Sequence, residues 1–240
     1  MAFDPSILVQ YWPLFAQGAW LTIQITAMAF LLGYTVGIVV ALIAQIPNRL
    51  VRILVAAYVG VLRGIPFIII LFLVYYGLPF AGIRLPAFVT GTVALSLFAS
   101  AYYAEIIRAA ILALPRGQFE SARVVGMSPL QAMRHVIAPQ ILRSLVPPST
   151  NMTLTMIKES SVLSSITVAE LTYQGLIVQG NTFAPFEVFA AVTLIYWAIT
   201  MVVAWLAGLL EARVGQAQQE TIIRNPLAAE FLSFDRRPVR

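Results

Sequence analysis

Long apolar runs, separated by short polar segments, occupy most of the chain. A helix that crosses a membrane needs about 20 mostly apolar residues. Runs of roughly this length or longer cover residues 18–44, 53–78, 86–112, 144–168 and 188–210. Because lipid leaves no partner for unpaired backbone groups, we expect these segments to be helical. The pattern predicts an all-α, polytopic membrane protein with about five transmembrane helices in residues 1–215, followed by a cytoplasmic tail at 216–240.

Two of the five runs contain residues that weaken a straight helix. Arg63 and Pro66 interrupt the second run. The fourth run has Pro147-Pro148 near its start and a Lys-Glu pair in its body. Proline removes a backbone donor and disturbs a helix interior. We therefore expect the fourth span to be broken or short.

Composition agrees with a membrane location. Of the 240 residues, 60% are hydrophobic and 10% are charged, whereas a soluble domain carries about a quarter charged residues. The absence of cysteine excludes a disulfide framework and thiolate metal sites. The single histidine, His135, makes no metal site on its own, so we expect no metal.

The basic residues predict the orientation, because positively charged loops stay in the cytoplasm. With five spans, one side carries only Arg84, and Arg63 and Lys158 lie at membrane depth. The other side carries Arg49, Arg52, Arg108, Arg116, Arg123, Arg134, Arg143, Arg213, Arg224, Arg236, Arg237 and Arg240. We therefore expect an N-terminus outside and a C-terminus in the cytoplasm, with no cleaved signal peptide. The net charge of +5 is explained by this asymmetry, so no nucleic-acid partner is expected.

A polar cytoplasmic segment, residues 114–139, joins the third and fourth spans. Its first helix, from about 116 to 125, is expected to stop at Gly126, which tolerates a left-handed conformation. Ser128 is positioned as the N-cap of a second helix, which is expected to stop at Pro139. Its capping box is formed by Ser128, Pro129 at the first helical position, and Gln131.

The second helix of this segment has one apolar face, formed by Leu130, Met133 and Ile137. Two interpretations remain open from these residues. The segment is either an amphipathic helix that lies on lipid or a rigid elbow that docks on a protein.

The same segment resembles the EAA loop of permease subunits from binding-protein-dependent ABC importers. The resemblance rests on Glu120-x-Ala122-x-x-x-Gly126, nine further residues, and Val136-x-Ala138-Pro139. It departs from the family pattern at Ser121, Val136 and Ala138. The resemblance implies that an ATPase is coupled through Glu120, Ala122, Gly126, Val136 and Pro139.

Four further motifs resemble the polar amino acid (histidine, glutamine, arginine) subfamily of these permeases. They begin at Arg63 (RGIP), Tyr75 (YYGLP), Tyr103 (YAEIIRAAI) and Lys158 (KESS). The resemblance implies an ATP-driven importer in a bacterial inner membrane. Its implied partners are a cytoplasmic ABC ATPase dimer that uses ATP and Mg, a second permease subunit in a homo- or heterodimer, and an extracytoplasmic solute-binding protein.

The chain carries no phosphate-binding loop of its own. Such a loop needs Gly-Lys-Ser/Thr, and the only lysine, Lys158, follows Ile157. The motifs HExxH and GxSxG are also absent. We therefore expect no catalytic residues and no enzyme activity in this chain.

Ionisable groups in lipid are expensive and are candidate functional residues. Arg63 is suited to bind a substrate carboxylate, or it forms an ion pair with Glu105 or Glu159. The fourth span carries a second set of candidates, which either line the substrate path or form hydrogen bonds across a permease dimer. They are Asn151, Lys158, Glu159, Ser160 and Ser161.

Glu105 and Arg108 are three residues apart, which predicts a structural ion pair on one helix face. Ile65, Ile70 and Phe98 stand where relatives tend to carry polar residues, so either the cavity wall is less polar or this subunit does not contact substrate. An alternative function is a secondary transporter or channel that uses Arg63, Lys158 and Glu159 as a relay. Five spans without a visible inverted repeat argue against it.

Overall fold

The computed structural model describes residues 4–115 and 117–223, and these ranges contain helices and no strand. The helices are α1 (Ser6–Gln10), α2 (Trp12–Ile43), α3 (Arg49–Gly64), α4 (Phe67–Gly77), α5 (Ala87–Leu112), α6 (Gly117–Val124), α7 (Pro129–Ala132), α8 (Ala138–Glu159), α9 (Leu171–Thr182) and α10 (Pro185–Ile223). Short η1 (Leu78–Ala81), η2 (Met133–Ile137) and η3 (Ser160–Ile166) connect them. The expected tail at 216–240 begins as the end of α10, and its residues from 224 onward lie outside the described ranges.

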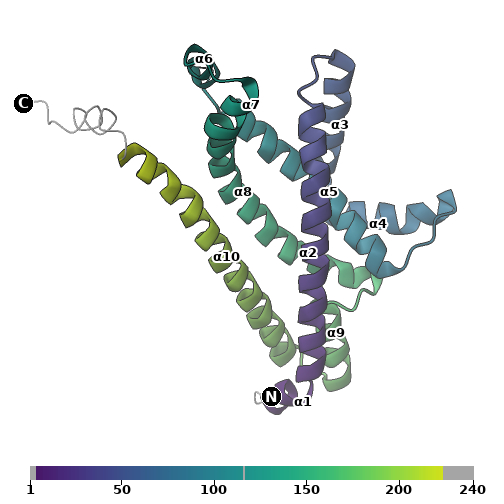
Figure 1. The fold of residues 1–240 in the computed structure, drawn as a ribbon. Helices are drawn as coiled ribbons and strands as arrows, with labels where there is room; N and C mark the ends of the chain where they lie inside the picture. The colour runs from purple at the N-terminus through teal and green to yellow at the C-terminus, as the bar shows by residue number, and fades with distance from the viewer. Residues whose placement is uncertain (1–3, 116, 224–240) are drawn as a thin grey trace, which may run out of the picture.

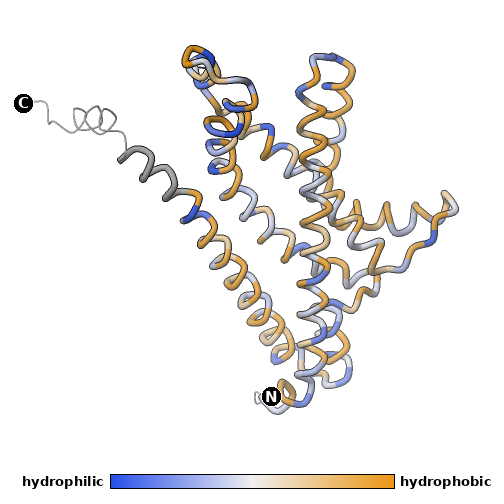
Figure 2. Tube along the Cα trace, in the orientation of Figure 1, coloured by the Kyte–Doolittle hydropathy of each residue, from blue (hydrophilic) through white to orange (hydrophobic). Residues whose placement is uncertain are grey.

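Three helices, α2, α5 and α10, are each long and apolar enough to cross a membrane alone. Two bent pairs, α3 with α4 and the α7–α8 segment with α9, raise the number to five if each pair is one span. Apolar residues cover most of the long helices, and hydrophilic residues gather at their ends (Figure 2). The predicted all-α membrane fold is confirmed.

The second expected span, 53–78, is not one straight helix. The axes of α3 and α4 differ by 107°, and α4 projects away from the bundle (Figure 1). The bend lies at Ile65, which is extended with φ −108° and ψ 135°. A residue before proline is pushed out of the helical region, so Pro66 imposes the bend.

The fourth expected span, 144–168, breaks later than its prolines suggest. α8 continues through Pro147 and Pro148 to Glu159, and the break follows in η3. There Ser160 and Ser164 donate from their hydroxyls to the carbonyl three residues earlier, at 2.7 and 2.8 Å. Such local hydrogen bonds compete with regular α-helical pairing and favour the tighter 3₁₀ turn.

The centre of the molecule is the pair α2 and α5, which cross at close range. Gly33 and Gly37 of α2 face the backbone of α5. A Cβ atom at Gly37 would lie 2.7 Å from the Cβ of Tyr103 and 3.1 Å from the carbonyl oxygen of Ser100. Glycine spacing of this kind lets two helix backbones approach in a membrane protein.

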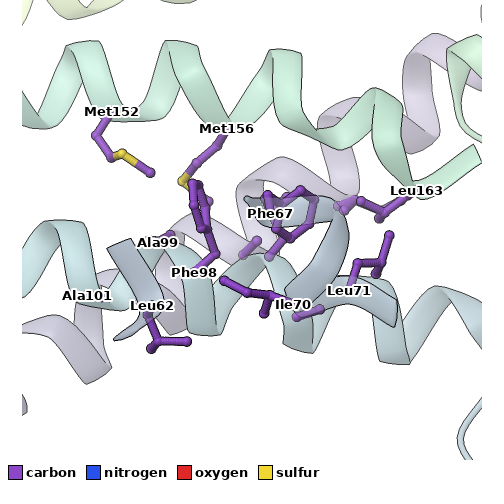
Figure 3. Close-up of a cluster of buried hydrophobic side chains, with 14 of the residues drawn as sticks. Leu62, Phe67, Ile70, Leu71, Phe98, Ala99, Ala101, Met152, Met156 and Leu163 are labelled. Atoms are coloured by element: carbon purple, nitrogen blue, oxygen red, sulfur yellow. The ribbon is translucent and has the colours of Figure 1, made fainter. Parts of the chain in front are cut away.

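The buried core joins α4, α5 and α8 (Figure 3). Phe67 packs against Phe98 with ring centroids 5.2 Å apart, and Met156 accepts a hydrogen bond from the Tyr103 hydroxyl at 3.3 Å. Ile70 and Phe98, two of the departures from the polar pattern of relatives, are buried in this core. Within this subunit they fill the interior.

Candidate functional site

The polar segment between α5 and α8 forms an elbow at one end of the molecule, far from α1 and α9 (Figure 1). α6 ends at Val124, and the turn that follows contains Gly126, whose φ is +79°. Met127 N–H donates to the Ala122 carbonyl, and Gly126 N–H donates to the Arg123 carbonyl, both at 3.0 Å. These two bonds form a Schellman motif, which a left-handed glycine permits.

The capping box predicted for the second helix is present. Ser128 Oγ accepts from the Gln131 N–H at 3.3 Å, and Gln131 Oε1 accepts from the Ser128 N–H at 2.8 Å. Both helices also anchor a small side chain, because Ala122 and Ala132 are buried. The elbow is therefore an ordered turn between two short helices, and each helix has one buried alanine.

The stop expected at Pro139 is wrong. α7 passes through the π-helical turn η2 directly into α8, with Pro139 in its first turn. Proline is tolerated in a first turn, and the wider π turn accommodates a missing donor. The side-chain amide of Gln140 donates to the Val136 carbonyl at 2.9 Å and to Gln118 Oε1 at 3.0 Å. Gln140 thereby links the start of α8 to α6, and the elbow continues into a membrane helix without a loop.

Large apolar side chains of the elbow face outward. Val124 is 87% exposed, Val125 is also exposed, and Leu130 is 78% exposed. The apolar face expected from Leu130, Met133 and Ile137 is not one face, because Ile137 is fully buried and Leu130 points outward. Exposed apolar patches of this kind mark protein or lipid contacts.

Of the expected coupling residues, Glu120 lies exposed in the first turn of α6, where a carboxylate is favourable. Ala122 is buried, Gly126 makes the turn, and Val136 and Pro139 are partly buried at the base of the elbow. The structure therefore brings these five residues into one unit.

A second cluster of charged residues joins α3 and α5. Arg108 donates to both carboxylate oxygens of Glu105, at 2.8 and 2.6 Å, which is the pair that their spacing predicts. Arg63 lies 4.0 Å from Glu105, and its guanidinium lies 5.2 Å from the ring centre of Tyr102. Of the two carboxylates considered for Arg63, Glu105 is the one in reach.

The candidates on α8 and η3 are separate from that cluster. Asn151 and Lys158 are exposed, and Glu159 and Ser161 are partly exposed. Ser160 is fully buried and its hydroxyl donates to the Ile157 carbonyl. In this subunit Ser160 contributes to the helix break, and its role in a path or at a second subunit stays a prediction.

Two side chains, Glu170 and Arg52, have roles that were not predicted from the sequence. Glu170 is fully buried, and its carboxylate caps α9 by accepting from the N–H groups of Thr172 and Tyr173 and from the Tyr196 hydroxyl. Its place just before a helix start was the available signal. Arg52, an exposed residue of α3, lines a cavity with Arg63, and the spacing of eleven residues places both on one helix face. Within the described ranges, no group of three or more His, Cys, Asp or Glu residues forms a metal site.

Comparison with known proteins agrees with this geometry. Residues 8–216 match the family described as the inner membrane component of binding-protein-dependent transport systems. The probable glutamine ABC transporter permease protein GlnM of Bacillus subtilis is 36% identical over 87% of this chain and 97% of its own length. The L-cystine transport system permease protein TcyB of the same organism is 32% identical over 88% of this chain and 91% of its own.

A solved structure is also similar. A crystal structure of an amino acid ABC transporter with histidines contains a chain that is 38% identical, with a TM-score of 0.82. The alignment covers 89% of this chain and all of that chain. The match spans the long helices and the elbow alike, so the chain belongs to the family of inner membrane components of binding-protein-dependent transport systems, as a permease subunit of an ABC importer.

Proposed function

We propose that this permease subunit forms the path for a polar amino acid or a related small solute and is driven by a separate ATPase that docks on its elbow. The observation that carries the proposal is the elbow itself. Exposed Val124, Val125 and Leu130 surround a glycine turn that is continuous with a membrane helix. The named substrates of the relatives, glutamine and L-cystine, support the substrate class.

The docking unit comprises Glu120, Ala122, Gly126, Val136 and Pro139. In this proposal an ABC ATPase dimer, which uses ATP and Mg, receives the elbow in the cytoplasm, and the N-terminus lies outside. A second permease subunit completes the path, and an extracytoplasmic binding protein delivers the solute. The separation of α1 and the elbow at opposite ends supports this orientation together with the arginine-rich elbow end.

The proposed substrate path follows the exposed polar face of α8 and the bend of α3. Asn151 and Lys158 are seven residues apart, which places them on one helix face with Glu159 and Ser161 beside them. Arg63 is the remaining candidate, at the end of α3. Lys158 supplies the positive charge that the carboxylate of an amino acid requires.

The docking proposal is tested with Leu130→Asp in the full chain, co-expressed with its ATPase. Leu130 is largely exposed, so the change leaves the interior intact, but it places a charge on the proposed interface. We expect normal membrane insertion, loss of ATPase co-purification and loss of ATP-dependent uptake.

Val9→Asp is the matched control, because Val9 is 80% exposed on α1 at the opposite end. It is expected to leave ATPase binding intact. If Leu130→Asp retains ATPase binding and uptake, the docking assignment fails. Uptake by the chain in proteoliposomes without any ATPase would overturn the proposed function as a whole.

A further inference from the structure

A cavity of about 570 Å³ opens between α2, α3 and α5 at the elbow end of the molecule. Its polar lining comes from all three walls. These residues are Gln45 just after α2, Arg52 and Arg63 on α3, and Glu105 and Arg108 on α5. The proposed coupling role of the elbow does not use this cavity, and Arg63 is the one lining residue that is also a candidate for the substrate path.

The cavity is positively charged. Three guanidinium groups and one carboxylate line it, which leaves an excess of two positive charges. The carboxylate of Glu105 accepts both of its short hydrogen bonds from Arg108, whereas Arg63 is 4.0 Å away. Arg52 and Arg63 therefore keep donors that can bind an anion in the cavity.

Between these two arginines, α3 carries small side chains. Ala56 and Gly60 line the cavity, and a Cβ atom placed on Gly60 would meet no atom within 4 Å. The space for a ligand is thus provided by α3 itself, on the face that joins its two arginines.

Most of the remaining lining of the cavity is aliphatic. It consists of Val40, Ala41 and Ala44 at the end of α2, Val55, Ala56 and Val59 on α3, and Ala104 and Leu112 on α5. These aliphatic side chains lie on helices that we treat as membrane-spanning. A ligand in the cavity therefore meets arginines at its charged group and hydrocarbon beside it.

We propose that this cavity binds the phosphate of an anionic phospholipid, whose acyl chains lie along the aliphatic residues of α2, α3 and α5 that line the cavity. Guanidinium groups bind phosphate through two parallel hydrogen bonds, which an ammonium cannot do. Basic pockets between membrane helices at the cytoplasmic side suit anionic headgroups. Free phosphate shares the headgroup chemistry but makes no use of the aliphatic lining.

The test uses the full chain, purified in detergent and depleted of lipid. Binding of palmitoyl-oleoyl phosphatidylglycerol, of the phosphatidylcholine with the same acyl chains, and of inorganic phosphate is measured by native mass spectrometry and by the shift in melting temperature. We expect phosphatidylglycerol to bind and to raise the melting temperature, with phosphatidylcholine and inorganic phosphate having little effect.

Two variants change the cavity in different ways. Arg52→Gln removes one charge and is expected to weaken phosphatidylglycerol binding about fivefold, the effect of one arginine near an anionic lipid. Gly60→Leu keeps every charge and fills the space, so it is also expected to weaken binding. The matched controls are Arg49→Gln, outside the lining, and Gly208→Leu on α10, where a Cβ is equally free of contacts.

The possible results separate the proposal from its competitors. Equal binding of phosphatidylcholine would show that acyl chains alone are recognised, and equal stabilisation by inorganic phosphate would assign a free anion; either result overturns the proposal. Displacement of phosphatidylglycerol by millimolar L-glutamine would assign the cavity to a transported solute and also overturn it. Undiminished binding in both Arg52→Gln and Gly60→Leu would place the lipid elsewhere.

Discussion

At the scale of single residues, the carboxylate of Glu170 joins α9 to α10. It accepts hydrogen bonds from the Thr172 and Tyr173 N–H groups at 2.9 and 2.8 Å, and from the Tyr196 hydroxyl at 2.6 Å. The first two bonds cap α9, and the third links α9 to α10. The position of α9 after the break in the fourth span therefore depends on one buried side chain.

Removing the hydroxyl with Tyr196→Phe is expected to cost about 1–3 kcal/mol of stability, since a buried acceptor loses a short bond. Glu170→Ala is expected to cost more, because it leaves three donors without their acceptor. Both are measured as shifts in the thermal unfolding of the purified chain. Tyr173→Phe is the control, because Tyr173 meets Glu170 through its backbone; a loss as large as that of Tyr196→Phe would refute the role of the Tyr196 hydroxyl.

At the scale of elements, the close contact between α2 and α5 requires a residue without a side chain at Gly37. Gly37→Ala would place its Cβ 2.7 Å from the Cβ of Tyr103, closer than two carbon atoms can pack. We expect α2 to move from α5 and stability to fall by about 1–3 kcal/mol. Thermal unfolding of the purified chain measures the loss.

The control for that change is Gly208→Ala in α10, where a Cβ meets nothing within 4 Å. There the replacement is expected to be neutral or to stabilise the helix by about 0.5–1 kcal/mol. A similar effect of both substitutions would mean that the approach of α2 to α5 is not tight at Gly37.

The sequence predicts some helix ends better than others, because some have one strong local signal and others depend on local signals that compete. The capping box at Ser128 and the turn at Gly126 depend on neighbouring residues, and both are present as predicted. The continuation through Pro139 depends on a π turn, and the late break depends on the serines of η3. The prolines alone therefore predict a helix end at Pro139 and a break at Pro147-Pro148, where the structure has neither.

The candidate site shows a second limit. The pairing of Glu105 with Arg108 follows from their spacing on one helix. The approach of Arg63 to Glu105 depends on how α3 packs against α5, and the sequence therefore left Glu159 equally open as a partner. The burial of Ser160 and Ile137 was likewise decided by tertiary packing.

At the scale of the whole molecule, the elbow and the membrane domain are joined by a rigid connection. α8 has 22 residues, so it is about 33 Å long at 1.5 Å per residue, and η2 joins it to α7 without a loop. The Arg143 guanidinium donates to the Val214 carbonyl at 3.2 Å, and Thr150 donates to Glu211 at 3.0 Å, so α8 also holds α10. In the proposed coupling, motion of the elbow would therefore be passed to both α8 and α10.

This connection predicts a variant in which ATPase docking and transport are separated. Leu142 and Ser144 are exposed on α8 above the membrane core, and Leu142→Gly with Ser144→Gly weakens the helix by about 1 kcal/mol at each site without removing a buried side chain. We expect the ATPase to remain bound while uptake falls severalfold. The double alanine variant at the same positions keeps the helix and is expected to transport normally. If the glycine variant transports as well as the alanine variant, a stiff α8 is not required for coupling.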